Sequence, residues 1–140
     1  ISSGLVGSEM CIRDRLSRGA KLGVLHGAAS YVCQNNEGQI NETESISAGL
    51  DYPGVSPIHC FLKDTKRARY TYATDEDALN AYKLVTKFEK LNPSLEPSHA
   101  FAEAIRIAPR LNKDTVIIVN SCGDAKKDRD ILKKRLEKRI

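Results

Sequence analysis

The stretch Thr115–Val119, with the sequence TVIIV, is a continuous run dominated by β-branched residues. A run without polar alternation is typical of a strand buried on both faces, as in a parallel sheet. Helices are predicted on either side, over residues 96–108 and 125–140, and the short loop Asn120–Asp124 follows the strand. The order helix, buried strand, loop, helix predicts an α/β layer structure.

Caps, turn residues and periodicity predict the remaining elements. Thr74 is expected to cap a helix, because three carboxylates follow at residues 75–77, where the positive end of the helix dipole favours them. Pro97 suits the first position of the next helix. The other predicted features are a hairpin over 31–42 with a turn at 35–38, a short helix from Pro57, a strand over 68–74 and a helix stop at Asn92–Pro93.

The charge and composition exclude several classes of function. The net charge of +4 is concentrated in residues 125–140, which hold eight Lys or Arg and three Asp or Glu, so it describes a terminal helix and no nucleic-acid surface. No apolar run is long enough to span a membrane. The four cysteines and three histidines show no metal-ligand spacing. We therefore expect neither a nucleic-acid nor a membrane partner.

Residues 1–15 differ in character from the rest of the chain. They show neither the apolar period of a helix or strand nor the features of a secretory signal. Leu5–Asp14, LVGSEMCIRD, matches one reading frame of a transposase sequencing adapter. We interpret residues 1–15 as a non-native leader that packs against nothing specific, and residues 16–140 as the protein fragment behind it.

Two loops could carry chemistry. Asn120–Asp124 leaves the predicted strand at its carboxyl end, where α/β sheets bind ligands, and contains a glycine before a helix. Ser45–Gly54 is rich in small residues, which allow backbone carbonyls to converge on a hard cation. Taken alone, each loop is more typical of an ordinary structural loop, and Glu96 is more typical of a plain carboxylate at a helix start.

Four segments together resemble one family. They occur in the order and spacing of the tryptophan synthase β chain, a pyridoxal-phosphate-dependent family, and their resemblance covers residues 25–122. The match is to the last third of that family's chain, which implies the C-terminal part of an incomplete three-layer α/β fold over residues 16–140. The segments are GQINETESISAGLDYPGVSPIHCFLKD, TDEDALNAYKL, PSLEPSHAFAEAI and VIIVNSCGD.

The resemblance assigns roles around the first loop. Asp51 matches an acid that engages the substrate and pairs with an arginine of a mobile domain on closure. Leu25 and His26 match residues that line an indole channel and are often aromatic in the family. Backbone carbonyls that bind a monovalent cation, sodium or potassium, are matched by Leu50, Tyr52 and Gly54.

The resemblance also assigns cofactor-binding residues. Glu96 matches a carboxylate beside the cofactor ring, and Gly123 belongs to the loop that approaches it. Cys122 matches a serine that faces the ring nitrogen, and because a thiol is a weak donor, Ser121 is the alternative for this role.

The family's activity is implied with these residues. It uses pyridoxal 5'-phosphate to convert L-serine into an aminoacrylate and adds indole to give L-tryptophan, in association with an α chain and a second β chain. A cytoplasmic enzyme is implied, or a plastid one if the source is photosynthetic. The family's Schiff-base lysine and glycine-rich phosphate loop lie upstream of the match, and none of the nine glycines here are adjacent. The fragment itself is therefore predicted to be inactive.

Two alternatives stay open on the sequence. One is another pyridoxal-phosphate β-replacement or dehydratase enzyme of the same fold. The other is a free-standing, non-catalytic α/β binding module. The stretch SISAGLDYP favours the tryptophan synthase β chain over the first.

Overall fold

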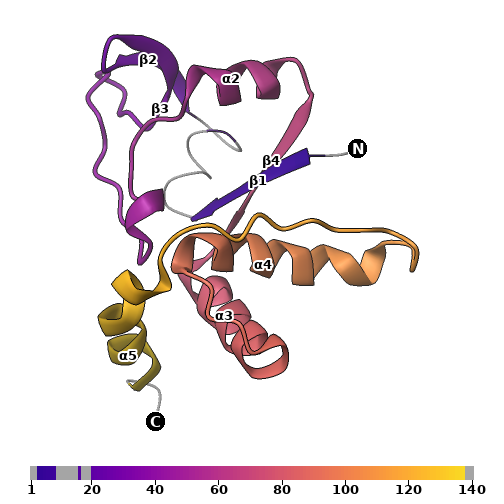
Figure 1. The fold of residues 1–140 in the computed structure, drawn as a ribbon. Coiled ribbons are helices and arrows are strands. Elements are labelled where there is room, and N and C mark those ends of the chain that lie inside the picture. The colour runs from indigo at the N-terminus through magenta and orange to yellow at the C-terminus, as the bar shows by residue number, and fades with distance from the viewer. Residues whose placement is uncertain (1–2, 9–15, 17–19, 138–140) are drawn as a thin grey trace. The chain divides into compact units, whose positions relative to one another are not determined.

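The structure, a computed structural model, describes residues 3–8, 16 and 20–137 (Figure 1). It contains both helices and strands, which confirms the predicted α/β class. The chain divides into two units, residues 1–72 and 73–140. Among the described residues, none of the helices combines the length and the apolar character that a bilayer crossing requires.

The described part of the first unit contains two two-stranded sheets, β1 with β4 and β2 with β3. Strands β2 and β3 are antiparallel, with Lys21 opposite Val32 and Leu25 opposite Ala28. The elements are β1 (Ser3–Ser8), β2 (Lys21–Leu25), β3 (Ala28–Val32), η2 (Ala48–Leu50), α2 (Pro57–Asp64) and β4 (Ala68–Ala73), whose last residue belongs to the second unit.

The hairpin lies earlier in the chain than predicted. It closes at His26 and Gly27, whose φ angles of 51° and 75° allow a two-residue turn between twisted strands. The predicted turn at 35–38 does form, since the Asn35 side chain accepts hydrogen bonds from the amides of Glu37 and Gln39, both at 2.9 Å. It is followed by a single bridge rather than a strand, so the predicted hairpin over 31–42 is wrong in extent.

Strand β1 belongs to the segment interpreted as a leader. Because Ser3–Ser8 pairs with β4, the expectation that this segment packs against nothing specific is wrong for these residues. Residues 9–15 lie outside the described part of the chain. The non-native origin of residues 1–15 stays a prediction, which the nucleotide sequence of the gene would test directly.

Helix α2 packs against β3. Its N-terminal residues explain where it begins, and its buried residue Cys60 explains which face contacts the strand. Pro57 occupies the first helical position, as predicted, and the Ser56 hydroxyl accepts a hydrogen bond from the amide of Ile58. Cys60 faces inward and its sulfur accepts a hydrogen bond from the amide of Tyr31 at 3.4 Å. The Tyr31 hydroxyl donates to Asp64 at 2.8 Å, so the middle and the C-terminal end of the helix are both tied to the strand.

The second unit is built on two helices that contact each other, α3 (Asp75–Glu89) and α4 (Leu95–Ile107), whose axes run in clearly different directions in Figure 1. Small buried residues of α3, Ala78 and Ala81, allow α4 to approach closely. His99 of α4 is fully buried, and its Nδ1 lies 2.7 Å from the Leu95 carbonyl oxygen. The elements are α3 (Asp75–Glu89), α4 (Leu95–Ile107), η3 (Ala108–Arg110), η4 (Ala125–Asp128) and α5 (Arg129–Glu137).

The predicted cap of α3 is confirmed, and its contribution to the free energy of unfolding can be measured. The Thr74 hydroxyl accepts from the Asp77 amide and the Asp77 carboxylate accepts from the Thr74 amide, both at 3.0 Å, which is a capping box. Thr74→Ala should lower the free energy of unfolding by about 1 kcal/mol. Asn80→Ala, at an exposed position of the same helix, is the control and should change it by less than about 0.5 kcal/mol in urea titrations. Equal effects of the two substitutions would contradict this cap.

The strand predicted at Thr115–Val119 is wrong. The segment has no regular secondary structure, and its apolar side chains are exposed, Val116 by 82% and Ile118 by 90%. A strand exists only where another strand completes its hydrogen bonds, and the described part of this unit places no strand beside the segment. The terminal helix is confirmed, and it begins as the 3-10 turn η4 before α5.

Candidate functional site

The Ser45–Gly54 loop in the first unit is held at both of its ends. The turn η2 is closed by hydrogen bonds from the Leu50 amide to the Ser47 carbonyl at 3.0 Å and from the Asp51 amide to the Ala48 carbonyl at 3.4 Å. Farther along, the Pro53 carbonyl accepts from the Cys33 amide at 2.8 Å. These bonds fix the path of the backbone between residues 47 and 53, which includes the predicted cation carbonyls of Leu50 and Tyr52, and Gly54 forms a bridge with Val32.

The structure brings the predicted channel residues beside the predicted cation residues. The rings of His26 and Tyr52 are stacked, with centroids 6.0 Å apart and an interplanar angle of 14°. A Cβ on Gly54 would lie 2.6 Å from Cδ2 of Leu25, so the absence of a side chain allows this approach. Four residues predicted separately therefore form one neighbourhood.

The donors that this loop could offer a cation are main-chain oxygens of Leu50, Tyr52 and Gly54. Across residues 3–8, 16 and 20–137, no group of three or more His, Cys, Asp or Glu side chains could hold a metal ion. Neutral carbonyl oxygens suit a hard cation, and the turn limits their movement. Asp51 is exposed, so its carboxylate is accessible to a partner from solvent.

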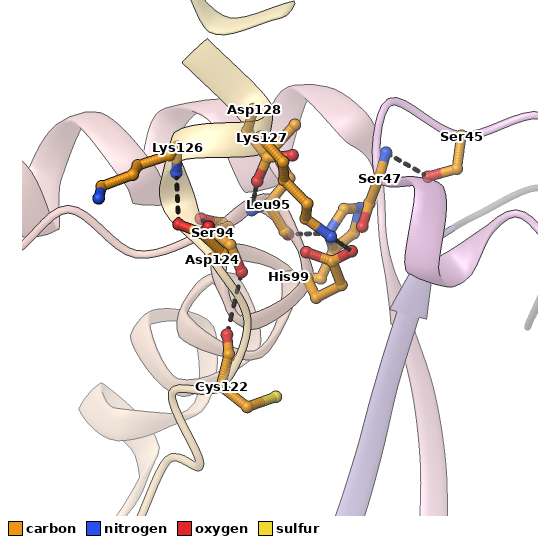
Figure 2. A network of polar contacts seen from close by, with 12 residues as sticks. Ser45, Ser47, Ser94, Leu95, His99, Cys122, Asp124, Lys126, Lys127 and Asp128 are labelled. Atoms are coloured by element: carbon orange, nitrogen blue, oxygen red, sulfur yellow. Dashed lines mark hydrogen bonds and ion pairs between the residues drawn. The ribbon is translucent and has the colours of Figure 1, made fainter.

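In the second unit, the start of α4 meets the loop before η4, as Figure 2 shows. The Ser94 hydroxyl donates to the Cys122 carbonyl at 3.0 Å. Gly123 has φ of 95°, and a Cβ there would lie 3.2 Å from the Ser94 Cβ and 3.6 Å from Oε2 of Glu96. The predicted cofactor residues Glu96, Cys122 and Gly123 are thus gathered at one place.

Charge at this place is paired. Nζ of Lys127 lies 2.5 Å from Oε1 of Glu96, whose side chain is 17% exposed. The hydrogen bond to Glu96 is the main reason that the pKa of Lys127 is raised above its ordinary value. Asp128, only 2% exposed, accepts a hydrogen bond from the Leu95 amide at 2.7 Å.

Lys127 and Asp128 are absent from the predicted site. The sequence shows them inside a strongly basic terminal segment, where both are ordinary members of a solvated helix. The contact with residues 94–96 is more than thirty positions away along the chain. The burial of Asp128 is the feature that distinguishes it from its neighbours, and burial is not visible in the sequence.

The carboxylate of Glu96 and the backbone at Gly123 could together contact one edge of a planar cofactor. A carboxylate held by a lysine, next to a backbone that lies close because residue 123 is glycine, can contact the polar edge of a heteroaromatic ring. Figure 2 shows the Cys122 sulfur pointing away from the hydrogen-bonded network. The assignment of Cys122 or Ser121 to the ring nitrogen therefore stays a prediction.

Comparison of the sequence with known proteins identifies relatives of this chain. No protein-family model matches the chain. The chain is 53% identical over 108 residues to the tryptophan synthase beta chain of Bordetella petrii, covering 77% of this chain and 27% of the relative. It is 48% identical over 125 residues to that of Allorhizobium ampelinum, covering 89% and 30%. The protein of the same name from Bordetella parapertussis is 52% identical over 108 residues.

The mixture of helices and strands defines the chain as an α/β protein. The chain spans less than a third of the length of the curated relatives that it matches. More particularly, it is homologous to a part of the tryptophan synthase β chain. The resemblance predicted from the four sequence segments is confirmed.

Proposed function

We propose that this chain is part of a tryptophan synthase β chain, and that the complete protein condenses L-serine with indole to form L-tryptophan. The observation that carries the proposal is the identity of 48–53% over 77–89% of the chain with proteins of that name. The complete enzyme would work in the cytoplasm, or in a plastid of a photosynthetic source, with an α chain and a second β chain as partners.

Pyridoxal phosphate, when bound, supplies an electron sink for the chemistry at the substrate carbon. On this chain, Glu96 and the 122–123 loop hold the ring edge of the cofactor. A thiol at Cys122, or a hydroxyl at Ser121, offers only a neutral partner to the ring nitrogen, which leaves that nitrogen unprotonated. The resemblance implies that the phosphate contacts and the covalent lysine lie upstream of the matched segments in the family's chain.

The loop of the first unit serves the substrate side. The carbonyls of Leu50, Tyr52 and Gly54 bind a sodium or potassium ion, which keeps the loop in its path and holds Asp51 toward the substrate. Asp51 is exposed, as a group must be that pairs with an arginine when the site closes. Leu25 and His26 line the approach of indole, and the His26–Tyr52 stack joins that approach to the cation loop.

Transplanting the chain tests this function. We expect a chimera, in which residues 25–140 replace the matching part of the Bordetella petrii relative, to form tryptophan from serine and indole in the presence of pyridoxal phosphate. The 140-residue chain alone should form none, because none of its lysines matches the family's catalytic position. Chromatography of the product measures both.

Two other results would each replace the proposal. Release of pyruvate from serine, with no use of indole, would assign the chimera to a dehydratase. Tryptophan formation by the chain alone would show that the chain is not a fragment in the functional sense. The unmodified relative is the positive control in both assays.

A further inference from the structure

The first turn of α4 is capped by a residue from the far end of the unit. The hydroxyl of the N-cap residue, Ser94, makes no capping bond to its own helix, and it donates to the Cys122 carbonyl at 3.0 Å. The amide of Leu95, the first helical residue, has no acceptor within its own helix, as at every helix start. The buried carboxylate of Asp128 fills that place at 2.7 Å.

A third link acts on the next residue. Glu96 lies in the same first turn, and its largely buried carboxylate is paired with Lys127. A carboxylate withdrawn from water is costly unless a cation accompanies it, so the lysine determines where the carboxylate rests. Three consecutive residues, 94–96, are each held by a different residue of the segment 122–128.

We propose that Lys127 and Asp128 are positioning residues, which keep Glu96 and the Cys122–Gly123 loop in one fixed relative geometry. The inference rests on the proposed function, because Glu96 and this loop are the groups assigned to the ring edge of the cofactor. Asp128 fixes the turn that carries Glu96, and Lys127 fixes the carboxylate itself. Neither residue needs to touch the cofactor.

The test of Asp128 uses the amide that it holds. In the chimera, Asp128→Ala should speed hydrogen exchange at the Leu95 amide about tenfold, in line with the loss of a helix cap, and should weaken binding of pyridoxal phosphate about tenfold. Asp128→Asn keeps an oxygen acceptor and should restore most of both. The matched control is Asp130→Ala, an exposed carboxylate two residues farther on, which should change neither.

The test of Lys127 uses charge. Lys127→Met should weaken pyridoxal phosphate binding about tenfold and move the acid limb of its pH profile upward, because a carboxylate without its cation keeps its proton to higher pH. Lys127→Arg should restore the profile. Asp124 and Asp128 also face Lys127 and raise its pKa, so the profile is compared in Asp124→Asn as well. Lys126→Met is the matched control at an exposed neighbour.

The outcomes separate this inference from the proposed function. Unchanged Leu95 exchange in Asp128→Ala, together with unchanged cofactor binding in folded Lys127→Met, would overturn the positioning role. If Asp128→Ala does not fold, Asp128→Glu displaces the carboxylate by one methylene and must show the same faster exchange. If Asp128→Ala speeds exchange at the Leu95 amide as expected but the chimera binds no pyridoxal phosphate, the role of Asp128 in positioning the turn is supported and the proposed function is contradicted.

Discussion

Gly123→Ala is expected to detach the loop before η4 from the start of α4. Residue 123 has φ of 95°, a region in which a side chain costs about 1–2 kcal/mol. The added Cβ would also press on the Ser94 side chain, whose Cβ would be 3.2 Å away. Because Ser94 holds the Cys122 carbonyl, the loop must move to relieve this contact. We expect pyridoxal phosphate to bind the chimera at least about tenfold more weakly, as measured by absorbance titration.

Gly38→Ala separates backbone strain from crowding at the site. Gly38 has a similar φ of 82°, but a Cβ there meets only the Gln34 side chain, at an ordinary 3.7 Å. This control should lose stability in urea titrations through strain alone and keep the affinity for pyridoxal phosphate. If Gly123→Ala and Gly38→Ala weaken binding equally, the close approach of residue 123 to Ser94 has no role in the site.

The elements that sequence predicted well are those with local causes. Thr74 and Asp77 form a capping box within four residues, and Pro57 starts a helix through its own ring, so neighbours alone determine both. The hairpin at 21–32 was missed because its turn, His26–Gly27, lacks the Asn-Gly or Asp-Gly pair that signals such a turn. A histidine takes the position that requires positive φ.

The elements that sequence predicted badly depend on distant partners. Thr115–Val119 has the composition of a buried strand, yet Ile118 is 90% exposed, and among the residues that the structure describes no strand pairs with this segment. Composition reports what a segment can bury, whereas pairing depends on the rest of the sheet. Our prediction assumed that a segment of strand-like composition forms a strand whether or not a partner strand is present.

Some residues of the candidate site could be predicted from the sequence, and others could not. Glu96, Cys122 and Gly123 came from the family resemblance, and the structure places them together. Lys127 and Asp128 could not be found in this way, because their partners at residues 95 and 96 lie far back along the chain. Long-range hydrogen bonds leave no periodic pattern in a sequence.

Gly54→Val is expected to impair the proposed cation loop more than Tyr52→Phe. Gly54 is buried, and even a single Cβ would lie 2.6 Å from Cδ2 of Leu25. Valine adds two further methyl groups, so either Leu25 or the backbone must move, and the backbone carries the carbonyl oxygens that we propose as cation ligands. Tyr52→Phe removes only a hydroxyl and preserves the ring stacked on His26.

Activity of the chimera against potassium concentration measures this difference. Gly54→Val should lower activity at least about tenfold and abolish its dependence on potassium, since overpacking displaces backbone as well as side chains. Tyr52→Phe should lose at most about threefold. Because the conflict is with Leu25, the double variant Gly54→Ala/Leu25→Ala should bind the ion better than Gly54→Ala, which is a coupling that only neighbours show. A greater loss in Tyr52→Phe than in Gly54→Val would mean that the tyrosine side chain, and not the carbonyls of the loop, holds the cation.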